Sequence, residues 1–469
     1  MKTLYRWHYR LGLLVTIPIL TWCISGLIPP IMANFFKIRP TQHTVELYAP
    51  VVDSTAPSLK TILERQYRQG FKQIRWVNYY DEPYYQIIRD KKEALYFHQQ
   101  TGKLLNDGDK LYAQFLARHF SEDFSSTIEG VERVDAFTAE YQSINRFLPV
   151  YKVRFARADG MEVYVSTESS RLATMKDNLH KQSMALFDNL HKWTFLQACP
   201  RLQFLLFLLF LLAGFLAAGS GFLIYGVFWN QLNTVRLDTR LRAWHRRIGL
   251  LVTCSILGFT FSGGYHALAK VQEQPLRTVP APLYTVEDLT LLPVLRAKFA
   301  DRPVGNVSLV KLEGQTFFQV QWLLQNEPAA YFNTKNLERI SQGDERYALA
   351  QSKLYTQLPD LQVVNTEEIV EFGGEYSSLN KRLPVRKINY KTPQRHSIYV
   401  EPSTGKIAAV IDENKRAEDF SFWMLHEYHF LDVLLGEQGR DAVLLLVVLM
   451  IMIVHILGVL LWRKRKLGY

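Results

Sequence analysis

Four histidines stand as two pairs at matching places in two similar stretches of the chain. The first pair is His8 and His245, each following a tryptophan in the segments WHYRLGLLVT and WHRRIGLLVT. The second pair is His191 and His426, each following a leucine in LHKWTF and LHEYHF. A neutral imidazole is a common axial ligand of heme iron, which takes one ligand on each face of the porphyrin. The residue types and their pairing therefore predict two bis-histidine heme sites.

Both pairs also have a simpler interpretation. The first pair could belong to an interfacial belt of aromatic and basic residues, and the second could be exposed histidines on amphipathic surface helices. His455, inside the last apolar segment, could replace either residue of the first pair as a ligand, because ionisable residues at membrane depth are costly and usually functional. Its counterpart in the first half of the chain is expected to be Ser220.

Four apolar segments would have to position these histidines. Each has roughly the 17–25 residues that a helix needs to cross a ~30 Å hydrocarbon core. They are Leu11–Ile28, Phe204–Phe228, Ile248–Leu268 and Ala442–Leu461. The sequence therefore predicts four transmembrane helices, the first of them retained rather than cleaved as a signal peptide. It excludes a soluble enzyme and a transporter with many helices.

The net charge of +11 comes from basic residues that gather at one end of these expected helices. They are Lys2, Arg6, Arg10, Arg236, Arg240, Arg242, Arg246, Arg247, Arg463, Lys464, Arg465 and Lys466. Cytoplasmic ends of membrane helices carry an excess of Lys and Arg, so both termini and the short link are expected in the cytoplasm. The two long loops would then lie in the periplasm, and no basic stripe remains for nucleic acid.

The two halves of the chain resemble each other in three blocks that follow in the same order. The tryptophan–histidine segments begin at positions 7 and 244, and LHKWTF and LHEYHF begin at positions 190 and 425. Between them, EYQSINRFLPV at 140–150 matches EYSSLNKRLPV at 375–385, so the three offsets are nearly equal. Each half reads as helix, external region, helix. An even number of helices per half predicts two parallel repeats related by an axis along the membrane normal.

The external regions alternate apolar and polar residues as strands do. In the first half, LPVYKVRFA and MEVYVSTESSRLA flank an Asp-Gly turn, which is a strong hairpin signal. Helical patterns lie between the hairpins, at 58–68 and 111–119. The predicted fold class is therefore an α+β membrane protein, four transmembrane helices as two parallel repeats, each with a large periplasmic α+β insertion.

These patterns divide the chain into seven segments. They are a first transmembrane helix (1–36), a periplasmic region (37–180), an outer interfacial segment with the second helix (181–229), a cytoplasmic link (230–243), the third helix (244–270), a second periplasmic region (271–418), and an outer interfacial segment with the fourth helix and a basic C-terminus (419–469).

Motifs for other cofactors do not occur in the sequence. There is no C-x-x-C-H, so a heme would be held without covalent attachment, as heme b. There is no G-x-G-x-x-G after a strand and no P-loop. The three cysteines have no metal-site spacing. Electrons would therefore have to come from membrane quinol or from another reductase.

The chain resembles the PepSY-associated transmembrane family over essentially its whole length. Its external hairpins resemble PepSY domains, with YVEPSTGKIAAV at 399–410 as the closest copy and YFHQQTGKLL at 96–105 as another. YVSTESSRLA at 164–173 lacks the glycine of that pattern. The helices match the family's H-x-x-x-G-L opening and its outer Leu-His. The resemblance implies a bacterial inner-membrane protein that binds heme and reduces ferric siderophores, although other relatives have no assigned activity.

The expected function is thus a di-heme b electron conduit that reduces an iron–siderophore chelate at the periplasmic face, with both histidine pairs as iron ligands. Trp193 and Trp423 are expected to contact the chelate, because each lies within three residues of a ligand on the periplasmic side. Their alternative role is interfacial anchoring in membrane lipid. The alternative for the whole chain is a non-redox PepSY scaffold that binds a protein or restrains a peptidase.

Overall fold

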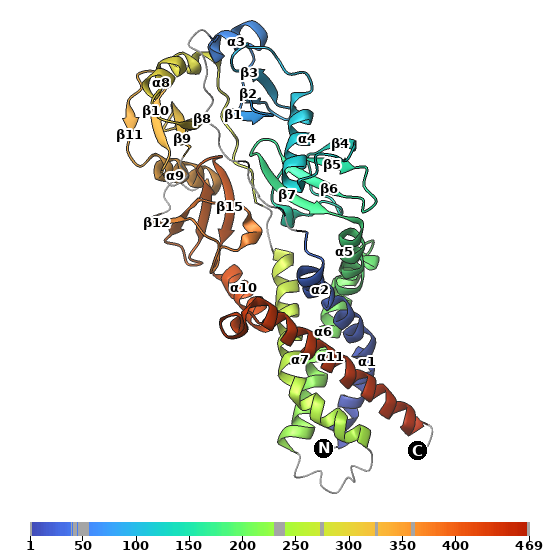
Figure 1. Ribbon diagram of the computed structural model, residues 1–469. Coiled ribbons are helices and arrows are strands. Elements are labelled where there is room, and N and C mark those ends of the chain that lie inside the picture. The colour runs from blue at the N-terminus through green and yellow to red at the C-terminus, as the bar shows by residue number, and fades with distance from the viewer. Residues whose placement is uncertain are drawn as a thin grey trace. The chain divides into compact units, whose positions relative to one another are not determined.

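The computed structural model describes residues 2–38, 40, 45, 56–228, 240–272, 276–323, 327–357 and 362–466 (Figure 1). The chain divides into two compact units, each built from segments of both halves. A helical unit holds 1–37, 179–274 and 413–469, and an α+β unit holds 38–178 and 275–412. The expected link at 230–243 lies mostly outside the described residues.

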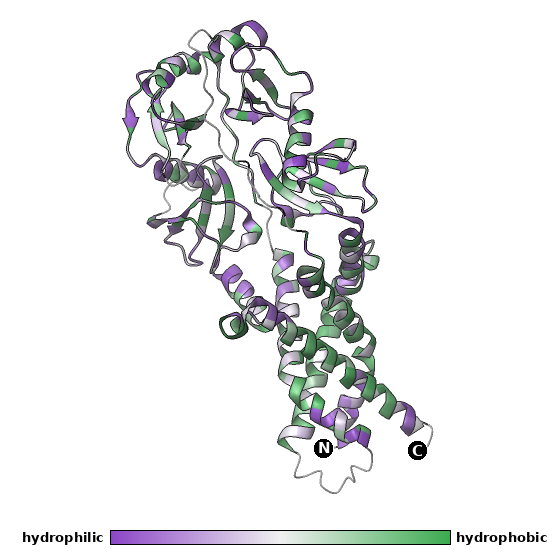
Figure 2. Ribbon diagram, viewed as in Figure 1, coloured by the Kyte–Doolittle hydropathy of each residue, from purple (hydrophilic) through white to green (hydrophobic). Residues whose placement is uncertain are grey.

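Four long helices form the helical unit, and all four are long and apolar enough to cross a membrane (Figure 2). They are α1 (Lys2–Gly26), α6 (Pro200–Phe222), α7 (Arg240–Gln272) and α11 (Asp432–Lys466). Helix α6 packs against α1 and α7, and α11 packs against α7 and α1. Apolar side chains such as Val15, Val252 and Val454 fill the centre. The expectation of four candidate membrane helices is confirmed.

Shorter elements lead the chain into and out of these helices. They are α2 (Ile28–Phe35), α5 (Asn178–His191), η2 (Thr194–Leu196), the π-turn η3 (Leu223–Val227), α10 (Glu413–Leu425) and η7 (His429–Leu431). Trp193 and Tyr428 adopt left-handed backbone angles just before η2 and η7, with φ of 57° and 56°. Helix α11 has a break at Gly436, whose φ is 68°.

Four antiparallel sheets make up the α+β unit. Their strands follow sequence order: β1 (Gln73–Tyr79), β2 (Glu82–Ile88) and β3 (Leu95–His98); β4 (Ile128–Val134), β5 (Val150–Phe155), β6 (Glu162–Ser166) and β7 (Arg171–Lys176); β8 (Val304–Leu312), β9 (Gln315–Trp322), β10 (Ala330–Asn333) and β11 (Arg339–Ile340); β12 (Val363–Ile369), β13 (Val385–Tyr390), β14 (Ser397–Glu401) and β15 (Lys406–Ile411). The expected hairpins are confirmed, and the unit is α+β as the sequence predicts.

Helices and short turns connect and cover these sheets. They are α3 (Leu59–Gln66), α4 (Gly108–Ser121), η1 (Ser143–Asn145), η5 (Val286–Leu289), α8 (Leu292–Lys298), α9 (Gly343–Thr356) and η6 (Ser378–Asn380). The β1–β3 and β8–β11 sheets share one core, in which Phe71 pairs with Tyr284. The backbone N–H of Trp76 donates to Asn306 Oδ1 at 2.8 Å, which joins the two sheets. The two halves are therefore interleaved in this unit.

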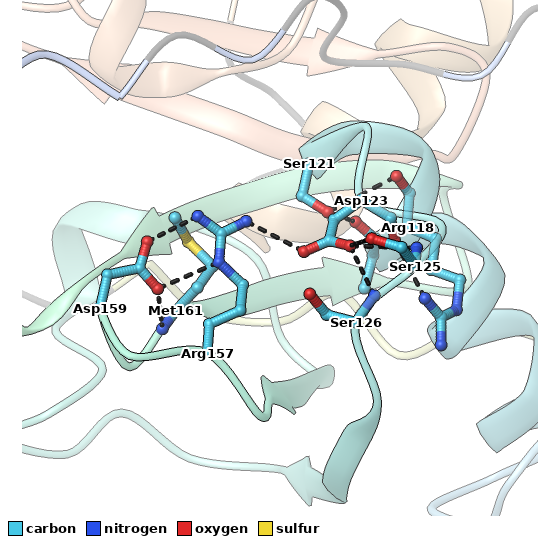
Figure 3. Close-up of polar contacts among 9 residues, drawn as sticks. Arg118, Ser121, Asp123, Ser125, Ser126, Arg157, Asp159 and Met161 are labelled. Atoms are coloured by element: carbon cyan, nitrogen blue, oxygen red, sulfur yellow. Dashed lines mark hydrogen bonds and ion pairs between the residues drawn. The ribbon is translucent and has the colours of Figure 1, made fainter.

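A carboxylate fixes the end of α4 to the β5–β6 turn (Figure 3). Asp123 accepts hydrogen bonds from the backbone N–H groups of Ser125 and Ser126, at 3.2 and 2.8 Å. Arg157 donates to Asp123 and to Asp159, so one guanidinium bridges the two segments. Burial alone raises the pKa of Asp123, but these donors outweigh it and hold the pKa far below its ordinary value. These contacts hold the end of α4 against the β5–β6 turn.

A second buried carboxylate joins the two halves. Glu401 is fully buried and pairs with Arg382, whose Nη1 lies 2.6 Å from Oε2. Arg171, from the other half, pairs with Oε1 of the same carboxylate. Burial raises the pKa of Glu401, but Arg171, Arg382 and Thr404 outweigh this effect and hold the pKa at about 2.

Glu401→Gln is expected to lower the free energy of unfolding by about 3 kcal/mol at pH 7, because two guanidinium groups lose their counter-charge. Since the pKa of Glu401 is lowered by folding, its stabilisation is complete above the ordinary pKa of 4.5 and disappears as pH falls toward 2. The difference in the free energy of unfolding between wild type and variant should therefore become smaller as the pH falls over that range. Unfolding followed by tryptophan fluorescence measures it. The control, Glu168→Gln, removes a partly exposed pair with Lys406 and should cost less than about 1 kcal/mol.

Candidate functional site

The structure brings together the two residues of the first histidine pair. The ring centroids of His8 on α1 and His245 on α7 are 6.3 Å apart, with an interplanar angle of 61°. His8 Nδ1 lies 3.0 Å from the Ala217 carbonyl oxygen, and His245 Nδ1 lies 3.1 Å from the Val454 carbonyl oxygen. A carbonyl only accepts, so Nδ1 carries the proton in both rings. Nε2 of each ring is then left with a lone pair.

The second pair meets in the same way. The ring centroids of His191 and His426 are also 6.3 Å apart, with the rings at 88°. His191 Nδ1 lies 3.0 Å from Ser25 Oγ, and His426 Nδ1 lies 3.1 Å from Ser262 Oγ. The Ser25 hydroxyl hydrogen is directed to backbone carbonyls of its own helix, Thr21 at 2.8 Å among them. Ser25 therefore accepts from Nδ1–H, which again leaves Nε2 as the lone pair.

These distances fit one iron between each pair of rings. An imidazole nitrogen binds a first-row metal at about 2 Å, and the nitrogen lies about 1 Å from its ring centroid. Two rings that ligate one iron from opposite sides therefore have centroids about 6 Å apart, which both pairs match. Holding the second ring nitrogen by a hydrogen bond is the usual way to orient a ligating histidine. The residues present fit a bis-histidine heme at each site.

Glycines make room around the first pair. A Cβ added at Gly221 would lie 2.9 Å from Cε1 of His8, which is closer than carbon atoms pack. A Cβ added at Gly458 would lie 3.6 Å from Cε1 of His245, which is an ordinary van der Waals contact. Gly12, one turn after His8, has no atom within 4 Å of such a Cβ. The structure therefore leaves open space beside Gly12.

Aromatic rings orient the second pair. Phe187 stacks on His191 at 4.7 Å and 13°, and Phe422 stacks on His426 at 4.5 Å and 11°. Each phenylalanine precedes its histidine by four residues, which is one helical turn. Together with the serines, these stacks fix both the rotation and the tilt of each imidazole.

Burial keeps the second pair neutral. It lowers the pKa of His191 to about 4, with a smaller effect from neighbouring Lys192. Burial also lowers the pKa of His426 to about 3, and His191 adds to the effect. Both imidazoles therefore keep their lone pairs at neutral pH, which is the form that binds iron.

Three further histidines of this unit have hydrogen-bond or ion-pair partners of their own, although His455 also lies close enough to His8 and His245 to interact with them electrostatically. His455 is bonded through Nδ1 to the Ile451 carbonyl of its own helix, at 2.9 Å. His266 Nδ1 pairs with the buried carboxylate of Glu418. His429 has both ring nitrogens occupied, with Asp432 at 2.6 Å and Glu427 at 3.1 Å. Among the described residues, none of the three makes a ring contact with another histidine, as the members of the two pairs do.

The two tryptophans expected to contact substrate differ in their surroundings. Trp193 is only 7% exposed and stacks on Trp22 at 5.4 Å and 10°. Its ring therefore packs within the helical unit. Trp423 is 43% exposed and stacks on His429 at 5.5 Å and 6°. Of the two, Trp423 has the accessible face that a chelate would need.

Several residues of these sites escaped the sequence analysis. Ser25 and Ser262 have the same offset as the two tryptophan–histidine segments, and each precedes a glycine, so extending that matching block along the helices would have found them. The same offset relates Ala217 to Val454, which hold the first pair. Applied to His455, this offset gives Ala218 as the equivalent residue in the first half, rather than the expected Ser220. Ser220 instead lies near His8, with Oγ 3.3 Å from Nδ1.

Among the described residues, no group of three or more His, Cys, Asp or Glu side chains is placed to hold a metal ion. A heme site needs only two, so this result concerns free metal ions. Compared with known proteins, the chain matches no protein-family model, and no curated protein matches it.

Proposed function

We propose that the protein is an electron conduit in the inner membrane of a bacterium, with two b-type hemes, that reduces ferric siderophores at the periplasmic face. The observation that carries this proposal is the pair of equal histidine arrangements, each with ring centroids 6.3 Å apart and Nε2 left for a metal. A bound heme supplies reversible one-electron transfer. Reduction suits iron release because hydroxamate oxygens prefer the harder Fe(III) to Fe(II).

The chain itself sets the spacing of the two sites. Helix α1 carries both His8 and Ser25, and α7 carries His245 and Ser262 at the same spacing. At a rise of about 1.5 Å per residue, this separation is about 25 Å along the helices. Buried residues of the helices between the pairs are mainly apolar, such as Val15, Ile19 and Val252. Two sites at this spacing divide the membrane into short electron steps.

An internal duplication with PepSY-like periplasmic insertions is part of the same proposal. Its support is the recurrence of side-chain contacts at a fixed sequence offset. For example, His8 contacts Ala217 and His245 contacts Val454. In each contact the two residues are 209 positions apart in the sequence. The basic residues at the helix ends support cytoplasmic termini and periplasmic insertions.

The visible spectrum of the purified protein tests the proposal against the non-redox scaffold. Protein from heme-replete cells should show the Soret band of six-coordinate, low-spin heme, with two hemes per chain. Its dithionite-reduced form should be reoxidised by a ferric hydroxamate siderophore. A colourless preparation would reject the redox function. Trp423, with its exposed ring, remains the predicted chelate contact.

Gly221→Ala is expected to cost the first site most of its heme, because the new methyl group collides with the His8 ring. Gly458→Ala is the matched control, since its methyl group makes only an ordinary contact with His245. The pyridine hemochrome assay should give about one heme per chain for the first variant and about two for the second. Equal heme content in the two variants would contradict this assignment of the first site.

A further inference from the structure

Two cations from equivalent positions of the matching blocks converge in the α+β unit. Arg146 and Lys381 each follow the short turn of their block, Arg146 after η1 and Lys381 after η6. Lys381 Nζ reaches across to the first half, 2.5 Å from the Ala173 carbonyl oxygen and 3.5 Å from Asn145 Oδ1. Lys381 therefore binds the residue next to Arg146, and the two positive charges are close enough to repel each other.

No carboxylate neutralises this pair within the described residues. The buried carboxylate of Glu401 is already shared between Arg171 and Arg382. The bonds of Lys381 go only to neutral oxygens. Burial lowers the pKa of Lys381 to about 8, and the charges of Arg146 and Lys176 add to the effect. A folded protein keeps such a cluster at a cost unless an anion compensates it.

An exposed aliphatic residue lies close to each cation in the sequence. Ile144 and Leu379 each precede their cation by two residues and are 51% and 48% exposed. Two positive charges, each with an exposed aliphatic residue two positions before it, match a ligand that has both carboxylates and hydrocarbon. Arginine binds a carboxylate through two parallel hydrogen bonds, and lysine adds a compact charge.

We propose that Arg146 and Lys381 form an anion-binding site for the carboxylate groups of a negatively charged metal chelate. The inference rests on the proposed function in taking this chelate as the substrate. It places substrate recognition in the α+β unit, on residues that both halves contribute, and it makes the charge of the chelate the basis of selection.

Isothermal titration with gallium(III) citrate tests the site in the full-length protein. Gallium(III) is not reduced under these conditions, so binding is measured separately from electron transfer. The double variant Arg146→Gln, Lys381→Met is expected to weaken binding at least tenfold. The control Lys311→Met removes an exposed lysine of β8 and should leave binding unchanged. A gallium(III) complex of a neutral hydroxamate should bind alike to all three proteins.

Two further titrations identify the source of the anion. Inorganic phosphate should bind at least tenfold more weakly than the gallium complex, and anionic lipid in nanodiscs should not compete with it. Unchanged affinity in the double variant, no binding at all, or equal affinity for phosphate or lipid would overturn the inference. A colourless protein that still binds gallium citrate through these residues would reject the heme proposal and leave the anion site standing.

Discussion

Replacing His191 and His426 together with alanine is expected to remove one heme and leave the other. Each imidazole is fixed by a serine and a stacked phenylalanine, and alanine has no atom that can reach the iron. Heme content should fall from about two to about one per chain. Reoxidation of the dithionite-reduced variant by a ferric siderophore should slow at least a hundredfold, because the site nearer the chelate is lost.

His180→Ala is the control, since His180 lies on the same helix α5 but in no histidine pair. It should retain two hemes and the wild-type rate. Loss of both hemes in the double variant would mean that heme binding at one site depends on the other. Full retention would mean that the heme ligands are other residues.

Replacing the first pair, His8 and His245, is expected to separate two activities. Steady-state turnover with a membrane donor should fall at least a hundredfold, because electrons enter at the cytoplasmic side of the proposed path. Single-turnover reoxidation of dithionite-reduced protein should persist, because the second pair retains its heme. Stopped-flow absorbance measures the single turnover, and siderophore reduction in inverted vesicles measures the steady state.

His455→Ala provides the comparison for the first site. His455 bonds only to its own helix in the described structure, so its replacement should leave both hemes and the single-turnover rate intact. If His455→Ala loses a heme while His8→Ala retains both, the ligand pairing proposed for the first site is wrong.

The sequence predicted the elements better than the details of the sites. Continuous apolar runs and alternating strands reflect which faces are buried, so four long helices and the hairpins could be predicted directly. The histidine pairing followed from the matching blocks, because equivalent residues of two similar halves meet when the halves pack together. Both inferences depend on short patterns that can be found in the sequence itself, either within one segment or by matching two segments.

The hydrogen-bond partners of the histidines could not be predicted in this way. The carbonyls of Ala217 and Val454 belong to the backbone, which every residue shares, so no residue type marks them. Trp193 illustrates a second difficulty. An aromatic near a membrane surface has the same sequence pattern whether it is exposed or stacked on Trp22, and only the fold distinguishes the two.

The fixed helical spacing between His8 and Ser25 implies a rule for how this chain can change in length. One residue inserted there would rotate everything beyond it by about 100° and turn Ser25 away from His191. The stretch from His426 to Val454 is slightly longer than the equivalent stretch from His191 to Ala217. The break at Gly436 lies in that longer stretch, where a non-helical residue can take up extra length. The two stretches therefore differ in length where no continuous helix joins one histidine pair to the other.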